Sequence, residues 1–465
     1  MSRSVSILIV VAFLLRLGLG LFSQIGLAQV GYGSETERAG YLFLDAYNRD
    51  SQARALARSG EPLLKAFDEK FSSDQYGGLL WLSAFLYRYV NESPLLIITL
   101  TALVGSLGGW FVYRAALVLF DTRTAYLACL VFLFYPDSVL LGAAQMREPF
   151  LMTFVAIAFA GLLQQINPSP KPKERMAGWL WILLALIGMV FLSPGIALIT
   201  MVTFSGWVFF SSQERRIPWQ AIVISIGLFV IALTALAASW ETLVTAPKGG
   251  ALGIVGTWAR ETIKWNADVL KRSSGIVQLL FETLPRGLAL PFVTVYGILQ
   301  PVLPAALIEP GNPFWQGLGI LRALGWYLLL PFAAYALFSA GNLNKSQHRR
   351  NMLWLALVVW GWIVIAAMRG GGDQWDNPRY RVILLAFLAI TSAQAFYALK
   401  TRWFWRIVWV EAIILLVFTH WYAWRYLKIG FNLGIRNTLL LALSAALLLV
   451  GGDWLWQRLR QRNTL

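Results

Sequence analysis

Long apolar stretches recur along the whole chain and alternate with shorter polar segments. Many of them reach the roughly 20 residues that a helix needs to cross the hydrocarbon core of a bilayer. The pattern predicts membrane-spanning helices at residues 5–27, 94–119, 124–143, 149–166, 178–193, 195–212, 219–239, 322–340, 352–368, 382–399, 406–424 and 436–452. We therefore expect an all-α polytopic membrane protein with about twelve or thirteen transmembrane helices.

The composition agrees with this pattern. Of the 465 residues, 58% are hydrophobic and only 13% are charged, whereas a soluble domain carries about 25% charged residues. The formal net charge is +16, but the basic residues lie mainly in short loops between apolar stretches. There they orient a membrane protein, and binding to nucleic acid is not expected. The single cysteine, Cys129, excludes an internal disulfide, and with two histidines the sequence predicts no cysteine or histidine metal cluster.

The basic loops predict how the chain is oriented. Five of them carry clustered Lys and Arg residues, namely Lys171, Lys173 and Arg175; Arg215 and Arg216; Lys345, Arg349 and Arg350; Lys400, Arg402 and Arg406; and Arg458, Arg460 and Arg462. Alternation through twelve spans places all five on one face, which the positive-inside rule makes cytoplasmic. We therefore expect the protein in the cytoplasmic membrane with both termini inside, and the first apolar stretch retained as an uncleaved span.

Three longer polar segments then face outward and contain most of the acidic residues. They are residues 29–93, 240–321 and 369–381. Within the second, residues 250–285 read as an amphipathic helix lying along the membrane surface. Residues 288–307 are apolar but interrupted by three prolines, and read as a thirteenth span or a re-entrant piece. Irregular backbone at membrane depth must be covered by protein or water, so we expect this stretch to line a cavity.

The first outer segment carries a candidate catalytic acid. Asp45 follows an apolar Tyr-Leu-Phe-Leu run and begins a predicted helix that ends near Gly60. Asp74 stands farther along, ahead of a second helix predicted at 79–90. Asp45 would thus lie close to the lipid headgroups on the outer face. The alternative is that it only caps its helix, which is a common role for aspartate.

Two further groups of charged residues occur at the outer ends of predicted spans. Arg147 and Glu148 precede Pro149, a residue suited to the first turn of a helix. Glu148 would then face a helix N-terminus, and its role could be limited to that dipole. The sequence DQWDNPRYR places the run Arg379–Arg381 where another span begins. Those arginines could also be interfacial residues with extended side chains.

These residues together resemble the motifs of the GT-C membrane glycosyltransferases, which include protein O-mannosyltransferases and the aminoarabinose transferases that modify lipid A. In that superfamily the loop after the first span bears a catalytic Asp, followed by an aromatic residue at four, a small residue at eight, an aliphatic pair at eleven and twelve, and often Gly at fifteen. The corresponding positions are Asp45, Arg49, Ala53, Leu56, Ala57 and Gly60. The departure is at Arg49. The resemblance covers residues 1–165 and about 375–400.

Other motifs extend the resemblance. Glu148 in QMREPF matches an acid that the family has at the outer start of its fourth span. Arg379, Tyr380 and Arg381 match an Arg-Tyr-Arg signature that enters a late span in many bacterial members. Asp74 occupies the place of an acidic or Lys-Pro segment, although the Pro is missing here.

The resemblance implies one GT-C-like transmembrane domain over residues 1–465. Such a domain transfers a sugar from a polyprenyl-phosphate-linked donor to an acceptor on the outer face, with inversion at the anomeric carbon. Asp45 would be the general base that takes the proton of the acceptor hydroxyl. The partners would be this lipid-linked donor, the surrounding membrane lipids, and an acceptor that is a glycan, a lipid or a protein.

It also implies a set of substrate-binding residues around that base, namely Asp74, Arg147, Glu148, Lys264, Arg379, Tyr380 and Arg381. Arg379 and Arg381 would grip the donor phosphate, because guanidinium groups bind phosphate oxygens in pairs. Asp74 and Glu148 would orient the acceptor or hold a divalent cation such as Mg²⁺ or Mn²⁺ through oxygen ligands. Whether a metal is used stays open, since some relatives need one and others do not.

Three other functions compete with this one. A polyprenyl-glycan polymerase or ligase would share the cavity and the outer arginines, but should carry its catalytic loop late in the chain. A lipid or solute transporter commonly shows paired repeats and charges near the midplane, and the sequence shows neither. A non-catalytic scaffold derived from a transferase would account for the departure at Arg49.

Overall fold

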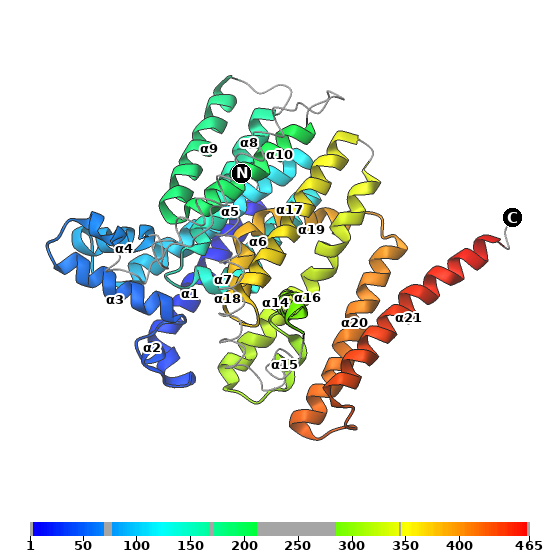
Figure 1. Ribbon diagram of the computed structural model, residues 1–465. Coiled ribbons are helices and arrows are strands. Elements are labelled where there is room, and N and C mark those ends of the chain that lie inside the picture. The colour runs from blue at the N-terminus through cyan, green and yellow to red at the C-terminus, as the bar shows by residue number, and fades with distance from the viewer. Residues whose placement is uncertain (1–2, 69–76, 167–171, 212–284, 344–345, 463–465) are drawn as a thin grey trace.

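The computed structural model describes residues 3–68, 77–166, 172–211, 285–343 and 346–462. Every regular element within these ranges is a helix (Figure 1). The expected all-α architecture is therefore confirmed. The span predicted at 219–239 and, except for Pro285, the surface helix predicted at 250–285 lie outside the described residues.

Nine helical stretches of the described chain are long and apolar enough to cross a membrane. They are α1 (Arg3–Val30), α5 (Pro94–Leu119), α8 (Glu148–Ile166), α10 (Pro194–Ser211), α16 (Pro313–Ser339), α17 (Ser346–Gly370), α18 with α19 (Asp376–Arg381, Leu385–Tyr397), α20 (Arg402–Tyr422) and α21 (Gly434–Arg462). All nine match a predicted span. The chain is a polytopic membrane protein.

The span predicted at 124–143 consists of two helices, α6 (Thr122–Phe134) and α7 (Pro136–Gly142), which are bent by 52°. Pro136 causes the break, because proline has no backbone N–H to donate and its ring excludes helical geometry at the preceding residue. Tyr135 accordingly has an extended conformation with ψ 127°. The apolar pattern alone therefore predicted one span where the backbone changes direction.

Arg16 of α1 lies fully buried against this bend. Its Nη2 donates to the carbonyl oxygen of Leu133 at 2.8 Å and to the hydroxyl of Ser138 at 2.9 Å. The last carbonyls of a helix lack partners within the helix, so the guanidinium satisfies one that the break leaves open. This intramembrane charge is thereby accounted for by packing.

Two neighbouring predictions have different outcomes. The stretches predicted as spans at 178–193 and 195–212 form α9 (Pro172–Leu192) and α10, which are separated only by Ser193. Residues 288–307 form α14 (Arg286–Ile298) and α15 (Leu303–Ile308), with 13 and 6 residues. Neither helix is long enough to cross a bilayer, so this stretch adds no thirteenth span.

The segment between the first two spans, which was predicted to face outward, forms a separate helical arm at one side of the bundle (Figure 1). It contains α2 (Glu35–Arg38), α3 (Leu44–Arg58), a 3₁₀ turn at Leu63–Phe67, and α4 (Gly78–Tyr89). The helices predicted from Asp45 and at 79–90 are therefore confirmed. A small apolar core joins α3 to α4 and contains Ala53, Leu56, Leu80, Ala84 and Tyr87.

A buried aspartate fixes the rotation of α3. Asp50 accepts hydrogen bonds from the hydroxyls of Tyr41, at 2.6 Å, and Tyr87, and it pairs with Arg54 at 2.6 Å. Burial and the neighbouring Asp50 raise the pKa of Tyr41, so its hydroxyl stays protonated and donates. Asp45 lies five residues earlier, about 140° around the helix. Fixing Asp50 against α4 therefore turns Asp45 away from α4.

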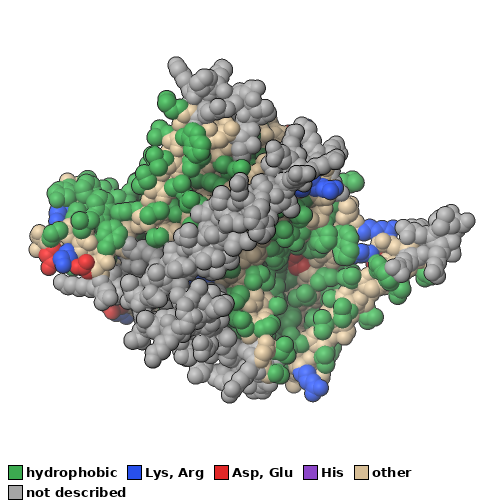
Figure 2. Space-filling view, turned by 45° about the horizontal axis from the view of Figure 1, so that its top comes forward, with side chains coloured by type: hydrophobic (Ala, Val, Ile, Leu, Met, Phe, Trp, Pro, Cys, Tyr) green, Lys and Arg blue, Asp and Glu red, His purple; other side chains and the backbone are tan. Residues whose placement is uncertain are grey.

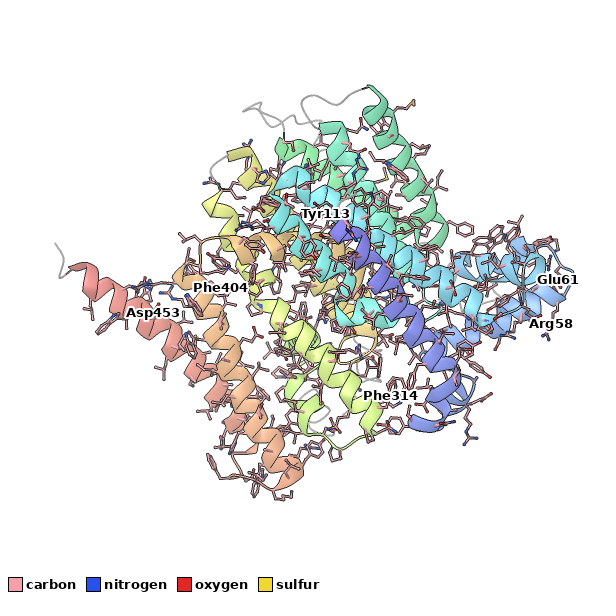
Figure 3. All side chains as sticks on the ribbon, turned by 180° about the vertical axis from the view of Figure 1, so that it is seen from behind. Arg58, Glu61, Tyr113, Phe314, Phe404 and Asp453 are labelled. Carbon is pink, nitrogen blue, oxygen red and sulfur yellow. The ribbon has the colours of Figure 1, made fainter. Side chains whose placement is uncertain are left out.

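Burial differs greatly between the helices of the bundle. In α8, and in α18 together with α19, 83% of the residues in the apolar membrane-spanning segment are buried. In α20 and in α21 the buried share of this segment is only 11%. The α20–α21 hairpin forms a second arm on the side opposite α3 and α4. Figure 3 shows this from behind: the labelled Phe404 and Asp453 of the hairpin lie on one side of the molecule, and Arg58 and Glu61 lie on the other. Hydrophobic side chains dominate the visible flank of the helices (Figure 2), as expected for surfaces that contact lipid.

Candidate functional site

A cavity of about 1010 Å³ lies at one end of the bundle. Its walls come from residues 32–45, 296–311, 315–322 and 372–379, and from Tyr422. The turn between α14 and α15 is thus part of the wall, as expected for irregular backbone at membrane depth. The volume is at the upper end of the range for small-molecule sites, so a sugar with a phosphate can be accommodated.

Asp45 and Arg379 meet in this cavity although 334 positions separate them in the sequence. The Nη1 of Arg379 lies 2.6 Å from Oδ2 of Asp45. Asp45 belongs to the first turn of α3, and the N-cap is Phe43, so the simple capping role for Asp45 is wrong. The aspartate side chain is 47% exposed, against 9% for the arginine. A half-exposed carboxylate beside a buried cation is open to a ligand.

Glu148 holds the other edge of the same guanidinium. It is the first residue of α8, is fully buried, and its Oε1 lies 2.6 Å from Nε of Arg379. Arg147 is nearby, with its Nε 4.0 Å from the same oxygen. A buried carboxylate needs a cation or strong donors, so Glu148 fixes Arg379 in place. Asp376 adds a third carboxylate, 3.4 Å from Nη1.

The charges around Asp45 determine its protonation. Burial disfavours the charged form of this carboxyl, but Arg379, and to a smaller extent Arg49 and Arg147, outweigh that effect and lower its pKa. Asp45 is therefore ionised in the ligand-free protein. Arg49, the departure from the GT-C pattern, is buried and donates to the backbone oxygen of Gln145 at 2.7 Å. Its cation contributes to the field at Asp45.

Arg381 lies elsewhere, whereas the ring centre of Tyr380 is 5.8 Å from the guanidinium of Arg379. The Arg381 guanidinium is 3.5 Å from the ring centre of Trp326 and donates to the backbone oxygen of Gln300 at 3.0 Å. This arginine is buried and supports the α14–α15 turn from behind. Tyr380 packs its ring 5.0 Å from the guanidinium of Arg369. Neither residue belongs to the cavity wall.

The remaining predicted residues cannot be placed. Asp74 and Lys264 lie outside the described ranges. Within the ranges that the structure describes, no group of three or more His, Cys, Asp or Glu residues has the geometry to hold a metal ion.

Sequence reasoning missed a second arginine in the wall. Arg322 of α16 pairs with Asp137 of α7 at 2.5 Å and donates to the backbone oxygen of Gln374 at 2.8 Å. Its guanidinium also lies 4.3 Å from the ring centre of Trp375. A signal was available, because a charge inside an otherwise apolar span is a candidate functional residue by default.

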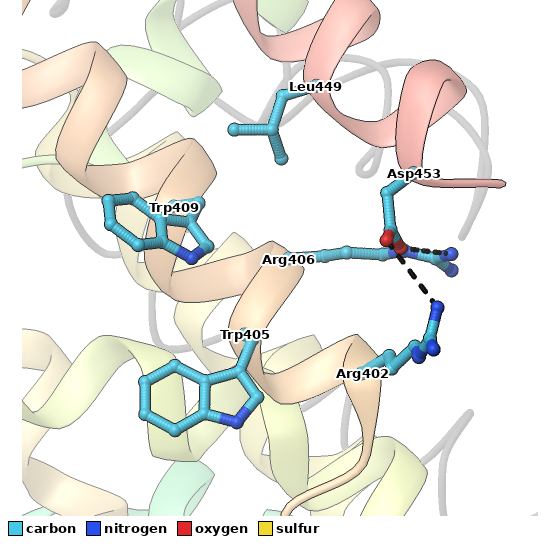
Figure 4. A pocket seen from close by; sticks show the side chains of 6 residues that line it. All are labelled: Arg402, Trp405, Arg406, Trp409, Leu449 and Asp453. Carbon is cyan, nitrogen blue, oxygen red and sulfur yellow. Dashed lines mark hydrogen bonds and ion pairs between the residues drawn. The ribbon is translucent and has the colours of Figure 1, made fainter. Parts of the chain in front are cut away.

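A smaller cavity of about 370 Å³ lies between α20 and α21 (Figure 4). It contains Arg402 and Arg406, which pair with Asp453 at 3.7 and 2.6 Å, beside Trp405 and Trp409. Tyr422, at the other end of α20, belongs to the large cavity. From Arg406 to Tyr422 the helix rises roughly 24 Å, so the two cavities lie near opposite ends of α20.

The orientation of the large cavity can be tested by cysteine labelling. Cys129 is buried, so Cys129→Ala provides a background without reactive thiols. Ser51 is exposed on the helical arm, and Gly341 is exposed beyond the end of α16, where a side chain meets no neighbour. If the cavity faces outward, Ser51→Cys reacts with a membrane-impermeant maleimide on intact cells. Gly341→Cys should react only after permeabilisation, and the reverse pattern would contradict the predicted orientation.

Comparison with protein-family models and with curated proteins gives no match. Among solved structures, the chain is similar to the oligosaccharyltransferase AglB of Archaeoglobus fulgidus in complex with an inhibitory peptide and a dolichol-phosphate. The TM-score is 0.45 and the identity 16%, over 96% of this chain and 54% of AglB. The same enzyme tethered to an acceptor peptide gives 0.43 and 15%, over 96% and 54%. Its complex with Zn and sulfate gives 0.41 and 15%, over 94% and 53%.

This chain thus spans about half the length of that oligosaccharyltransferase. A likeness of this degree transfers no residue, substrate or activity from AglB to this chain.

Proposed function

We propose that this protein is a membrane glycosyltransferase that moves a sugar from a polyprenyl-phosphate-linked donor to an acceptor on the outer face of the cytoplasmic membrane. The observation that carries the proposal is the contact between Asp45 and Arg379 in the large cavity. A base for the acceptor and a cation for the donor phosphate are both needed within one site. The 2.6 Å contact between the Arg379 guanidinium and the Asp45 carboxylate supports the assignment of these two roles to one site.

The donor phosphate is assigned to Arg379. This guanidinium lies at the start of a membrane-spanning helix and in the cavity wall, which suits a lipid-linked phosphate at headgroup depth. Its Nη2 has no partner among the described residues, while Nε and Nη1 are engaged by carboxylates. Guanidinium groups bind phosphate oxygens through paired N–H donors. Arg322 is a second cation in the same wall.

The reaction follows from these assignments. Asp45 accepts the proton of the acceptor hydroxyl while that oxygen attacks the anomeric carbon. The bond between this carbon and the phosphate oxygen breaks, and its electron pair leaves with the phosphate. One direct displacement inverts the anomeric configuration. Because phosphate is a weak base, its departure needs charge stabilisation by Arg379 more than protonation.

The acidic residues in the described part of the cavity do not form a site for a divalent cation. Glu148 and Asp45 both face the guanidinium of Arg379, and among the described residues no three acidic or histidine side chains are arranged to hold Mg²⁺ or Mn²⁺. Asp74, the other acid expected to hold a cation, lies outside the described residues. We therefore assign the binding of the negatively charged donor phosphate to the arginines. Glu148 then positions Arg379, and orienting the acceptor falls to other residues of the wall.

The proposed donor can be tested by mass spectrometry of lipids that remain bound to the purified protein. A polyprenyl phosphate or its glycosylated form should be enriched over the bulk membrane lipids. The matched control is the double variant Arg379→Gln with Glu148→Gln, which removes the cation together with its buried counter-charge. Equal lipid profiles for the two proteins would contradict the assigned donor.

A further inference from the structure

Three carboxylates contact the Arg379 guanidinium directly, and the next cation, Arg147, lies 4.0 Å from the nearest of their oxygens. Glu148, Asp45 and Asp376 all lie within 3.4 Å of one guanidinium. A donor phosphate brings further negative charge to the same group. Since like charges in a partly buried site repel strongly, the phosphate cannot simply add to the three carboxylates. One of them must give way.

The contacts indicate which carboxylate leaves. Glu148 is fully buried at the start of α8, so its release would strand a charge inside the protein. Asp376 is on the same short helix as Arg379 and lies farther away, at 3.4 Å. Asp45 comes from the outer arm, is 47% exposed, and competes directly for Nη1. Water and the cavity can solvate it once it separates from Arg379.

We propose that Arg379 makes the base dependent on the donor: it holds Asp45 in the empty site, and the donor phosphate displaces Asp45 from the guanidinium. This inference rests on the proposed function. It assigns Asp45 two successive partners, first Arg379 and then the acceptor hydroxyl. Binding of the donor before the acceptor follows from it.

The exchange changes the chemistry of the carboxylate. While paired with Arg379, Asp45 has a lowered pKa and is a weak base. Removal of that cation raises its affinity for a proton, as the acceptor hydroxyl arrives. After transfer the proton resides on Asp45, whose neutral carboxyl does not compete with the phosphate. Loss of that proton to water restores the carboxylate, which pairs with Arg379 again once the polyprenyl phosphate product has left the site.

The test measures binding of farnesyl phosphate to the purified full-length protein in detergent, without any sugar transfer. Asp45→Asn should bind it about fivefold more tightly than the wild type, because the competing carboxylate is removed. Glu309→Gln is the matched control. Glu309 lines the same cavity but contacts Tyr426 instead of Arg379, so it reports the effect of removing one negative charge in general.

The outcomes separate the possibilities. Tighter binding by Asp45→Asn beyond that of Glu309→Gln supports the exchange. Unchanged or weaker binding by Asp45→Asn, or equal tightening by both variants, overturns it. If inorganic phosphate competes with farnesyl phosphate at the same concentration, the site binds free phosphate and not a lipid-linked donor. If farnesyl phosphate binds neither to the wild type nor to any variant, the proposed donor itself is wrong. That result differs from a failure of the exchange alone.

Discussion

Asp45→Asn is expected to lower sugar transfer by a factor of about 10² to 10⁴, the usual contribution of a positioned general base. The amide has nearly the shape of the carboxylate but cannot accept the proton of the acceptor hydroxyl. The change should hardly affect folding, because the side chain is half exposed and such ion pairs contribute about 1 kcal/mol or less. Transfer is measured with purified protein and its lipid-linked donor, and folding by thermal unfolding in detergent.

Asp376→Asn is the matched control for that variant. Asp376 contacts the same Nη1 atom at 3.4 Å and undergoes the same chemical change. It should retain most of the activity, because it is not assigned the proton. A wild-type rate for Asp45→Asn, or an equal loss in both variants, would show that the base has been misassigned.

Arg379→Gln is expected to cost both stability and activity. Removing the guanidinium leaves the buried Glu148 without its closest cation. Breaking a buried ion pair on one side typically destabilises a protein by about 3 to 5 kcal/mol. Donor binding should also be lost, because the guanidinium assigned to the donor phosphate is removed and Arg322, another cation of the wall, is paired with Asp137. Thermal unfolding and binding of farnesyl phosphate measure the two effects separately.

The double variant Arg379→Gln with Glu148→Gln distinguishes these contributions. Without the buried carboxylate, no charge is stranded, and most of the lost stability should return. Donor binding and transfer should stay absent, because the phosphate still lacks its cation. Recovery of transfer in a stable double variant would mean that Arg379 only supports the fold.

Most of the fold was predictable because crossing a bilayer imposes a length and an apolar composition on each helix. That constraint does not depend on tertiary contacts, so the bounds of α5 were predicted to the residue. Prediction from hydropathy fails where the backbone geometry decides whether a helix continues. Pro136 divides an apolar stretch into α6 and α7, and 288–307 becomes two short helices. Hydropathy averages over such breaks.

The candidate site was only partly predictable. The motif resemblance selected Asp45, Glu148 and Arg379 from distant parts of the sequence, and the structure brings them together. It also paired Arg381 with Arg379 as phosphate ligands. Residues two apart on a helix lie about 200° around its axis from each other. The two arginines therefore point in different directions, and Arg381 supports the α14–α15 turn instead of lining the cavity.

Arg322 was missed for a different reason. Its partner Asp137 lies 185 positions away, and no local pattern shows that the two will meet. A lone arginine in an apolar stretch could have been singled out as a candidate, but only the packing of α16 against α7 places it in the cavity. Contacts between distant helices are decided by tertiary packing, which sequence periodicity does not encode.

The most direct measurement is an experimental structure of the full-length protein with farnesyl phosphate bound. We predict phosphate oxygens within hydrogen-bond distance of the Arg379 guanidinium, the prenyl chain leaving the cavity toward lipid, and the Asp45 carboxylate separated from Arg379. A phosphate bound away from Arg379, with Asp45 still in contact with that arginine, would contradict the assignment of this cavity as the donor site.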